Sequence, residues 1–82
     1  MGAEEINLRV VTQDGNEIFY KINPGTPLQK LMHAVCKRYG VTMGVVRFLF
    51  DNEEINETET PDELEMEDGD AIDVIIMQHG GP

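Results

Sequence analysis

The first part of the chain carries the pattern of a β-hairpin. From Ile6 to Val10, apolar and polar side chains alternate, which is typical of a half-buried strand. Asp14-Gly15 favours a tight hairpin turn because these residues accept positive φ. Residues 17–23 are rich in β-branched and aromatic side chains, as expected of a returning strand. An antiparallel hairpin therefore opens the fold, and whatever follows has to cover one of its faces.

A helix is predicted directly after this hairpin. Thr26, Pro27 and Gln29 fit the N-cap, N1 and N3 positions of a capping box. Apolar side chains then recur at steps of three or four and form one stripe: Leu28, Leu31, Met32, Val35 and Tyr39. Gly40 fits the left-handed position that ends such a helix. We therefore expect a helix over residues 27–39, packed on the hairpin.

The second half of the chain predicts two more strands. Residues 46–50 form a compact apolar segment, and residues 71–77 have the pattern of a final strand. Between them, residues 60–63 (Thr-Pro-Asp-Glu) repeat the capping pattern and predict a short helical turn that carries Leu64 and Met66 inward. A helix after a hairpin covers a sheet that later strands complete, so the predicted fold class is α+β.

Charge is distributed unevenly along the chain. The formal net charge of −10 argues against nucleic acid as a direct partner. All six lysine and arginine residues precede residue 48, whereas every charged residue between positions 51 and 73 is acidic. This asymmetry indicates either two surfaces of opposite charge or an acidic segment that only keeps the domain soluble.

Several classes of protein are excluded or disfavoured. Cys36 is the single cysteine, which excludes an internal disulfide and fits a reducing compartment, so we expect the nucleus and cytoplasm. No secretory signal or membrane-spanning apolar run is evident. His33 and Cys36 are three positions apart on the predicted helix, but a metal site needs more ligands. No catalytic motif appears, so we expect no enzyme activity, no cofactor, no metal and no membrane partner.

Several segments, in this order, resemble the SUMO branch of the ubiquitin-like superfamily. They are residues 6–11, 13–22, 26–32, 47–51, 60–70 and the pair Gly80-Gly81. The resemblance covers residues 6–81 almost without gaps, and its acidic segment at 60–70 is closest to plant-type and fungal-type members.

The resemblance implies a ubiquitin-like β-grasp fold. Its elements would follow the order ββαβ, short helix, β, with a mixed sheet packed on one main helix. The implied division is a short flexible N-terminal tail at 1–5, the β-grasp domain at 6–77, and a flexible C-terminal tail with the diglycine at 78–82.

The resemblance also implies a protein modifier that is conjugated through Gly81. SUMO proteases would expose this residue, and the SUMO-activating enzyme, the SUMO-conjugating enzyme and SUMO ligases would join it to substrate lysines. Gly80-Gly81 suits this route because a chain without Cβ can thread a narrow tunnel, although two terminal glycines alone can also be a plain flexible end. Pro82 makes the bond to be cleaved a tertiary amide, so we expect slow or blocked processing.

A second implied site is a groove between the second strand and the helix. It would bind SUMO-interacting motifs of other proteins by strand addition. Its apolar residues would be Ile18, Tyr20, Ile22, Leu31 and Val35, and its basic rim Lys21, Lys30 and Arg38, which favours acidic or phosphorylated ligands. Alternatively, Leu31 and Val35 are core residues. Asn23 and Val35 stand where many relatives have lysine and a larger aromatic residue, which affects affinity.

A third implied site is an acidic surface that helps to dock the conjugating enzyme. It comprises Glu63, Glu65, Glu67, Asp68 and Asp70. Docking of this kind weakens with salt, because the Debye length is only about 8 Å at physiological ionic strength. We expect a monomer. The alternative function is that of a SUMO-like interaction domain of a larger protein, which binds partners without being conjugated.

Overall fold

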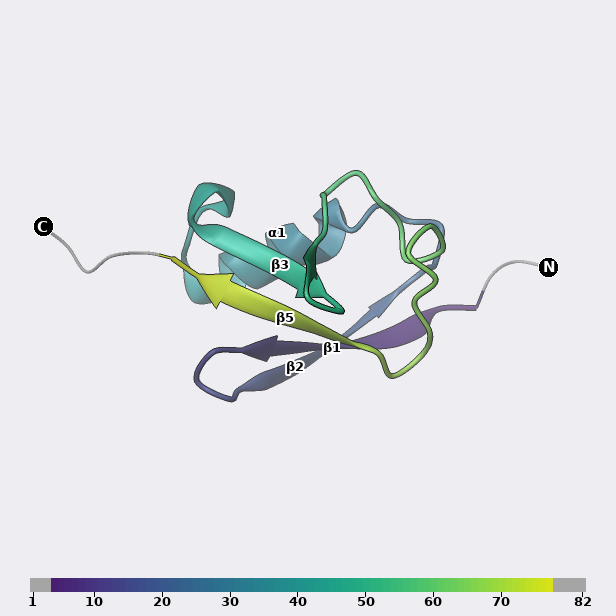
Figure 1. The fold of residues 1–82 in the computed structure, drawn as a ribbon, viewed down its shortest axis with the longest axis horizontal. Coiled ribbons are helices and arrows are strands. Elements are labelled where there is room, and N and C mark those ends of the chain that lie inside the picture. Colours follow the sequence, from purple (N-terminus) through teal and green to yellow (C-terminus); the bar gives the residue numbers. More distant parts are fainter. Residues whose placement is uncertain (1–3, 78–82) are drawn as a thin grey trace, which may run out of the picture.

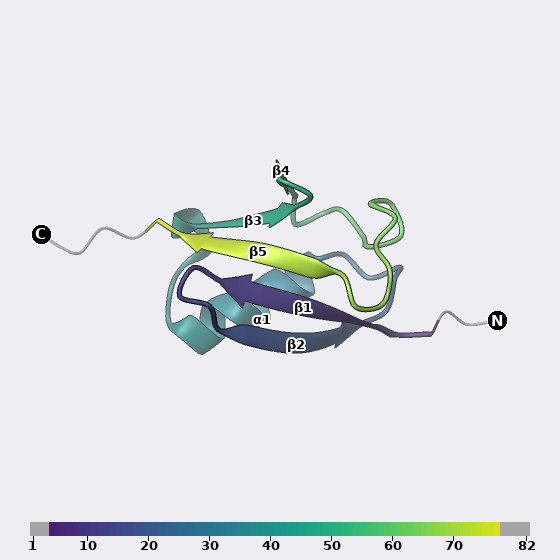
Figure 2. The same ribbon diagram turned by 60° about the horizontal axis from the view of Figure 1, so that its bottom comes forward.

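The fold is a five-stranded sheet with one main helix on one face (Figures 1 and 2). The computed structural model describes residues 4–77. Its elements are β1 (Ile6–Thr12), β2 (Glu17–Ile22), α1 (Gln29–Tyr39), the 3-10 helix η1 (Met43–Val45), β3 (Val46–Phe50), β4 (Glu53–Glu54) and β5 (Ala71–Ile76). Residues 1–3 and 78–82, which make up most of the two predicted tails, lie outside the described residues.

The strand order is β2-β1-β5-β3-β4. β1 pairs with β5 in parallel, and the other neighbours are antiparallel, so the sheet is mixed. The first and last strands therefore lie side by side in the centre, as Figure 2 shows. The predicted α+β fold, with a mixed sheet packed on one main helix, is confirmed.

The predicted hairpin is present, with Ile6 opposite Ile22 at one end and Val11 opposite Glu17 at the other. Gly15 has a φ of 90°, which glycine adopts without steric cost and which closes the turn. Because side chains alternate across a strand, Leu8 and Val10 of β1 are fully buried beneath α1 while intervening residues face outward.

The hydrophobic core lies between the sheet and α1. Its fully buried side chains come from β1, β5, α1 and the segment before the helix: Leu8, Val10, Ile72, Leu31 and Leu28. Each such side chain contributes about 1.5–3 kcal/mol relative to an exposed position. Val46 and Phe48 extend this core along β3, which gives α1 a continuous apolar surface to pack on.

The start of α1 differs from the prediction. The helix begins at Gln29, no side chain caps it, and the expected capping box at Thr26 is therefore wrong. The loop before β5 replaces it: the backbone N–H groups of Leu28 and Gln29 donate to the carbonyl oxygens of Glu59 at 2.8 Å and Glu57 at 2.9 Å. Carbonyls distant in sequence thus satisfy N–H groups that every helix start leaves without an intrahelical partner.

The end of α1 agrees with the prediction. Gly40 has a φ of 68° in the left-handed region, and its N–H lies at 3.3 Å from the carbonyl oxygen of Lys37. This conformation is the usual way in which a helix ends at glycine.

The second predicted cap forms in full. The N–H of Thr60 donates to the Glu63 carboxylate at 3.0 Å, and the N–H of Glu63 donates to the Thr60 hydroxyl at 3.2 Å. The residues that follow this cap form turns instead of a regular helix, and the backbone of Glu65 is left-handed, with a φ of 57°. Leu64 is half-buried and Met66 buried, so both side chains point inward as predicted. The sequence did not predict η1 or β4.

Candidate functional site

β2 is an edge strand of the sheet. Within residues 4–77 it pairs with β1 alone, so its second edge has no strand beside it. Such an edge presents backbone N–H and C=O groups that an extended peptide can pair with. The sheet order therefore provides the open strand that the predicted groove requires.

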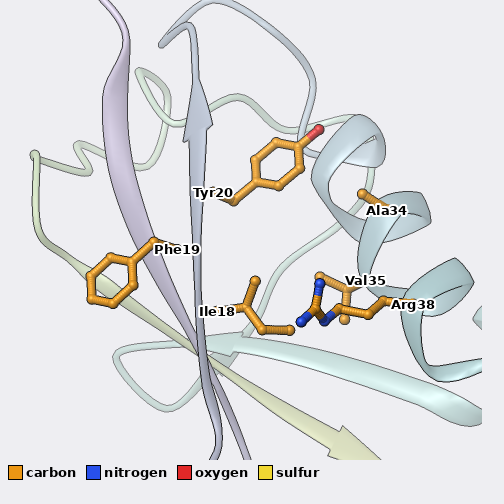
Figure 3. Close-up of a pocket in the computed structure, with 6 residues that line it drawn as sticks. All are labelled: Ile18, Phe19, Tyr20, Ala34, Val35 and Arg38. Carbon is orange, nitrogen blue, oxygen red and sulfur yellow. The ribbon is translucent and has the colours of Figure 1, made fainter.

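A cavity of about 250 Å³ lies between β2 and α1 (Figure 3). The residues that line it are Ile18, Phe19, Tyr20, Ala34, Val35 and Arg38. Ile18 and Tyr20 point from β2 toward the helix, whereas the ring of Phe19 points away from it. Phe19 is 65% exposed, because alternate residues of a strand face opposite sides of the sheet.

The structure divides the apolar residues of the predicted groove between the cavity and the core. Ile18, Tyr20 and Val35 line the cavity. Leu31 is fully buried and does not line it, so the interpretation of Leu31 as a core residue holds. Ile22 is also buried but borders a neighbouring depression. Val35 is both a core residue and a cavity wall.

The predicted basic rim surrounds this groove. Arg38 lines the main cavity, while Lys21 and Lys30 line an adjacent depression of about 100 Å³. Tyr20 borders both hollows, so they lie next to each other along β2. The two ion pairs in residues 4–77 join Arg9 to Glu17 and Arg47 to Glu54, so the three rim cations are free to meet an acidic ligand.

The predicted acidic surface is only partly free. Asp68 accepts hydrogen bonds from Asn7, and Asp70 accepts one at 2.7 Å from the backbone N–H of Glu67. The Glu63 carboxylate belongs to the capping box with Thr60. In the described part of the chain, the carboxylates of Glu65 and Glu67 have no hydrogen-bond or ion-pair partner. These two are therefore the acids most available to a docking partner.

The fold agrees with the comparison to known families. Residues 6–76 match the family described as "Ubiquitin-2 like Rad60 SUMO-like". The chain belongs to this SUMO-like family.

Named relatives support the assignment. The SUMO-like chain is 55% identical to "Small ubiquitin-related modifier 2" of Danio rerio over 78 aligned residues. This alignment covers 95% of this chain and 81% of the relative. It is 54% identical to the protein of the same name from Homo sapiens, covering 95% and 82%. Both relatives are vertebrate, so the expected likeness to plant and fungal members stays a prediction.

A solved structure supports the fold alone. "Caldiarchaeum Subterraneum Ubiquitin" superposes with a TM-score of 0.84 at 20% identity, covering 94% of this chain and 99% of the other. The ubiquitin-like β-grasp fold of the SUMO-like chain is thereby confirmed.

The predicted conjugation site lies outside the described residues. Gly80, Gly81 and Pro82 follow the last described residue, Met77, and their roles stay predictions. β5 ends at Ile76, where the N–H of that residue donates to the Gln13 side chain at 2.8 Å. The last strand therefore ends only a few residues before the predicted conjugation site in the sequence.

The helix pair His33 and Cys36 does not form a site. Cys36 is buried, its thiol lies 3.5 Å from the Met43 sulfur, and burial raises the thiol pKa. His33 is exposed. Residues 4–77 contain no group of three His, Cys, Asp or Glu placed to hold a metal, and no helix long and apolar enough to span a membrane.

The sequence prediction of the groove missed Ala34. This residue lines the cavity beside Val35 and leaves its helical side open, because its side chain is a single methyl group. The signal was present in the sequence: Ala34 lies three positions after Leu31 and four before Arg38, on the face that borders β2.

Proposed function

We propose that this chain is a SUMO-type protein modifier. The observation that carries the proposal is its 54–55% identity to two proteins named small ubiquitin-related modifier 2, over 95% of its length. In this proposal the chain acts as a monomer in the nucleus and cytoplasm, and it is joined to substrate lysines through the carboxylate of Gly81 once the bond after that residue has been cleaved.

The chain's own chemical role in this proposal is to supply an acyl group. The carboxylate of Gly81 is adenylated by the SUMO-activating enzyme, passed as a thioester to the SUMO-conjugating enzyme, and transferred to a lysine amine with the help of ligases. SUMO proteases cleave before and after conjugation. The catalytic groups belong to these enzymes, and the β-grasp domain is the surface by which they select the chain.

The groove supports a second, non-covalent role. An extended peptide that adds to the open edge of β2 forms main-chain hydrogen bonds, and the cavity beside Ile18 and Val35 receives one of its apolar side chains. Lys21, Lys30 and Arg38 favour peptides in which acidic or phosphorylated residues flank the apolar run. Such a peptide is a SUMO-interacting motif of a partner protein.

The acidic surface supports docking of the conjugating enzyme. Since Glu63, Asp68 and Asp70 are engaged within the fold, Glu65 and Glu67 are proposed as the residues that attract a basic partner. Attraction between exposed charges mainly raises the association rate and weakens as salt screens it. Replacing both residues with glutamine should therefore slow transfer to the conjugating enzyme more at low salt than at high salt.

ATP-dependent thioester formation with the SUMO-activating enzyme tests the main proposal. Three forms are compared: the full sequence, a chain ending at Gly81, and that shortened chain with Gly81→Val as a matched control. We expect the thioester only with the unchanged shortened chain. No thioester from it would refute the modifier function. If that chain still binds interacting-motif peptides, the non-conjugated interaction domain becomes the better account.

A separate measurement addresses Pro82. Incubation of the full sequence with a SUMO protease, followed by mass spectrometry, should show slow or no loss of this residue, because the bond to proline is a tertiary amide with restricted geometry. Rapid loss of Pro82 would contradict the expected block while leaving the modifier proposal intact.

A further inference from the structure

The cavity between β2 and α1 is large for a single aliphatic side chain. Its volume is about 250 Å³. An apolar protein cavity of about 150 Å³ is sufficient to bind benzene. The side of the cavity formed by α1 leaves much of this space open, because Ala34 and Val35 have short side chains. The space beside β2 therefore admits a ring.

The walls of this cavity are suited to a ring. Ile18 and Val35 provide aliphatic contact, and the Tyr20 ring provides an aromatic neighbour that favours edge-to-face or offset packing. In Figure 3 the Arg38 side chain extends from α1 toward β2, across the same hollow. Within residues 4–77 its guanidinium has no ion-pair partner, and a planar guanidinium stacks well on an aromatic face.

We propose that the peptides preferred by this groove carry an aromatic anchor. The ligand is an extended segment that pairs with the open edge of β2 and places a Phe, Tyr or Trp side chain between Ile18 and Val35, beneath Arg38. Acidic residues of the same segment face Lys21 and Lys30. This inference deepens the proposed non-covalent role and rests on peptide addition at β2.

An aliphatic anchor would fill this hollow less completely than a ring. A Val side chain in a hollow of this size leaves part of the wall without partner atoms, and those dispersion contacts are lost. A larger ring removes more apolar surface from water and also meets Tyr20 and Arg38. The adjacent depression is smaller, about 100 Å³, and is bordered by Lys21, Lys30 and Glu5, so the ring is expected in the larger hollow.

The test uses peptides that differ at one position only. The probe is an acidic-flanked, extended peptide with a short Val/Ile run, in which each apolar position in turn holds Phe, Tyr, Leu, Val or Ala. Affinity is measured by calorimetry, and the binding site is located by backbone resonance shifts. At one position we expect Phe to bind about tenfold more tightly than Val, the discrimination that a few extra carbons produce in an apolar pocket.

Variants of the residues that line the cavity test whether the preference for the Phe peptide arises there. Val35→Phe fills the hollow and should remove the advantage of the Phe peptide over the Val peptide. Ala34→Leu narrows the same space from a half-buried helix position and serves if Val35→Phe does not fold. Arg38→Gln should weaken the Phe peptide about two- to fivefold, as expected for loss of an exposed cation–π contact. Glu53→Ala, on the exposed strand β4 at the opposite edge of the sheet, is the control and should change neither affinity.

The outcomes separate this inference from the proposal on which it rests. A preference for Phe that disappears in Val35→Phe or Ala34→Leu supports the aromatic anchor. Equal or tighter binding of Val and Leu peptides at every position overturns it, while groove binding itself remains. If no peptide shifts the resonances of residues 18–38, both the aromatic anchor and the proposed groove function are refuted.

Discussion

The carboxylate of Asp68 holds Asn7 at the start of β1, although the two residues are 61 positions apart. One carboxylate oxygen, Oδ1, accepts the backbone N–H of Asn7 at 2.7 Å and its side-chain amide at 3.2 Å. The N–H of Gly69 returns a hydrogen bond of 2.7 Å to the carbonyl oxygen of Asn7. These bonds set the parallel entry of β5 beside β1, so one acid of the predicted docking surface also maintains the fold.

Asp68→Ala should therefore lower the free energy of unfolding by about 1–2 kcal/mol, because Asn7 loses a charged acceptor for two donors. Urea denaturation measures the change. Glu67→Ala is the matched control: it removes a neighbouring exposed carboxylate without a partner in the described residues, and it keeps the backbone N–H that Asp70 accepts. We expect a change below about 0.5 kcal/mol for it. Equal losses in the two variants would contradict a structural role for Asp68.

Two similar threonines should differ in their effect on stability. Thr60 caps its turn through a hydrogen bond with the N–H of Glu63, whereas no side chain caps α1 after Thr26. Thr60→Ala should cost about 1 kcal/mol, the usual effect of losing an N-cap, and Thr26→Ala less than about 0.5 kcal/mol. Thermal or urea unfolding of both variants checks this difference. A larger loss from Thr26→Ala would mean that its hydroxyl stabilises the helix start after all.

These two threonines also mark the limit of prediction from sequence. Both begin a Thr-Pro segment with Glu or Gln three positions on, and the same local pattern predicts a cap for each. At α1, the carbonyls of Glu57 and Glu59 satisfy the first N–H groups instead. Such partners come from a loop distant in sequence, and no local pattern reports them.

The strands and the groove were more predictable for a physical reason. Alternation from Ile6 to Val10 and the apolar stripe of α1 are imposed by burial in the core, and this burial leaves a regular period in the sequence. β4 is too short to show a period. Its turn depends on Asp51 and Asn52 at φ of 56° and 68°, a conformation that Asp and Asn accept but do not by themselves specify.

Asp14 offers a test of the hairpin turn by pH. Its pKa lies below the ordinary value because the Thr12 hydroxyl, and next the backbone N–H of Asn16, donate hydrogen bonds to the carboxylate. Thr12→Val should therefore raise this pKa toward the ordinary value of about 3.9, whereas Thr12→Ser, which keeps a hydroxyl, should change it less. An NMR titration of the Asp14 carboxyl carbon measures both. Equal shifts would show that the hydroxyl is not the cause.

The sign of the accompanying stability change follows from linkage. A carboxyl whose pKa is lower in the folded state stabilises that state at pH values above its unfolded pKa, and this contribution is lost as pH falls through the folded pKa. Acidification below about pH 4 should therefore reduce the unfolding free energy less in Thr12→Val than in the unchanged chain. A steeper loss in the variant would contradict this assignment.

Cys36 should be protected from alkylation in the folded chain. Its side chain is buried against Met43, and burial raises the thiol pKa, so little reactive thiolate is present. We expect iodoacetamide to modify it at least about 100-fold more slowly under native conditions than in urea, since reaction requires opening of the helix. The control is Cys36→Ala with Thr42→Cys, which moves the thiol to an exposed position. Similar rates for the two cysteines would refute the protection.

The raised pKa of Cys36 also predicts how stability changes in alkali. Because burial keeps the folded thiol neutral, ionisation of the thiol at alkaline pH occurs first in the unfolded state and stabilises that state.

 

A group whose pKa is raised by folding contributes stability that is fully present below its unfolded pKa and is lost as pH rises through the folded pKa. The unfolding free energy should therefore fall as pH rises above about 8.5, the ordinary thiol value. Cys36→Ala, which has no thiol to ionise, should lose less stability over the same alkaline range. Urea denaturation at a series of pH values measures both chains, and parallel profiles would show that Cys36 does not contribute.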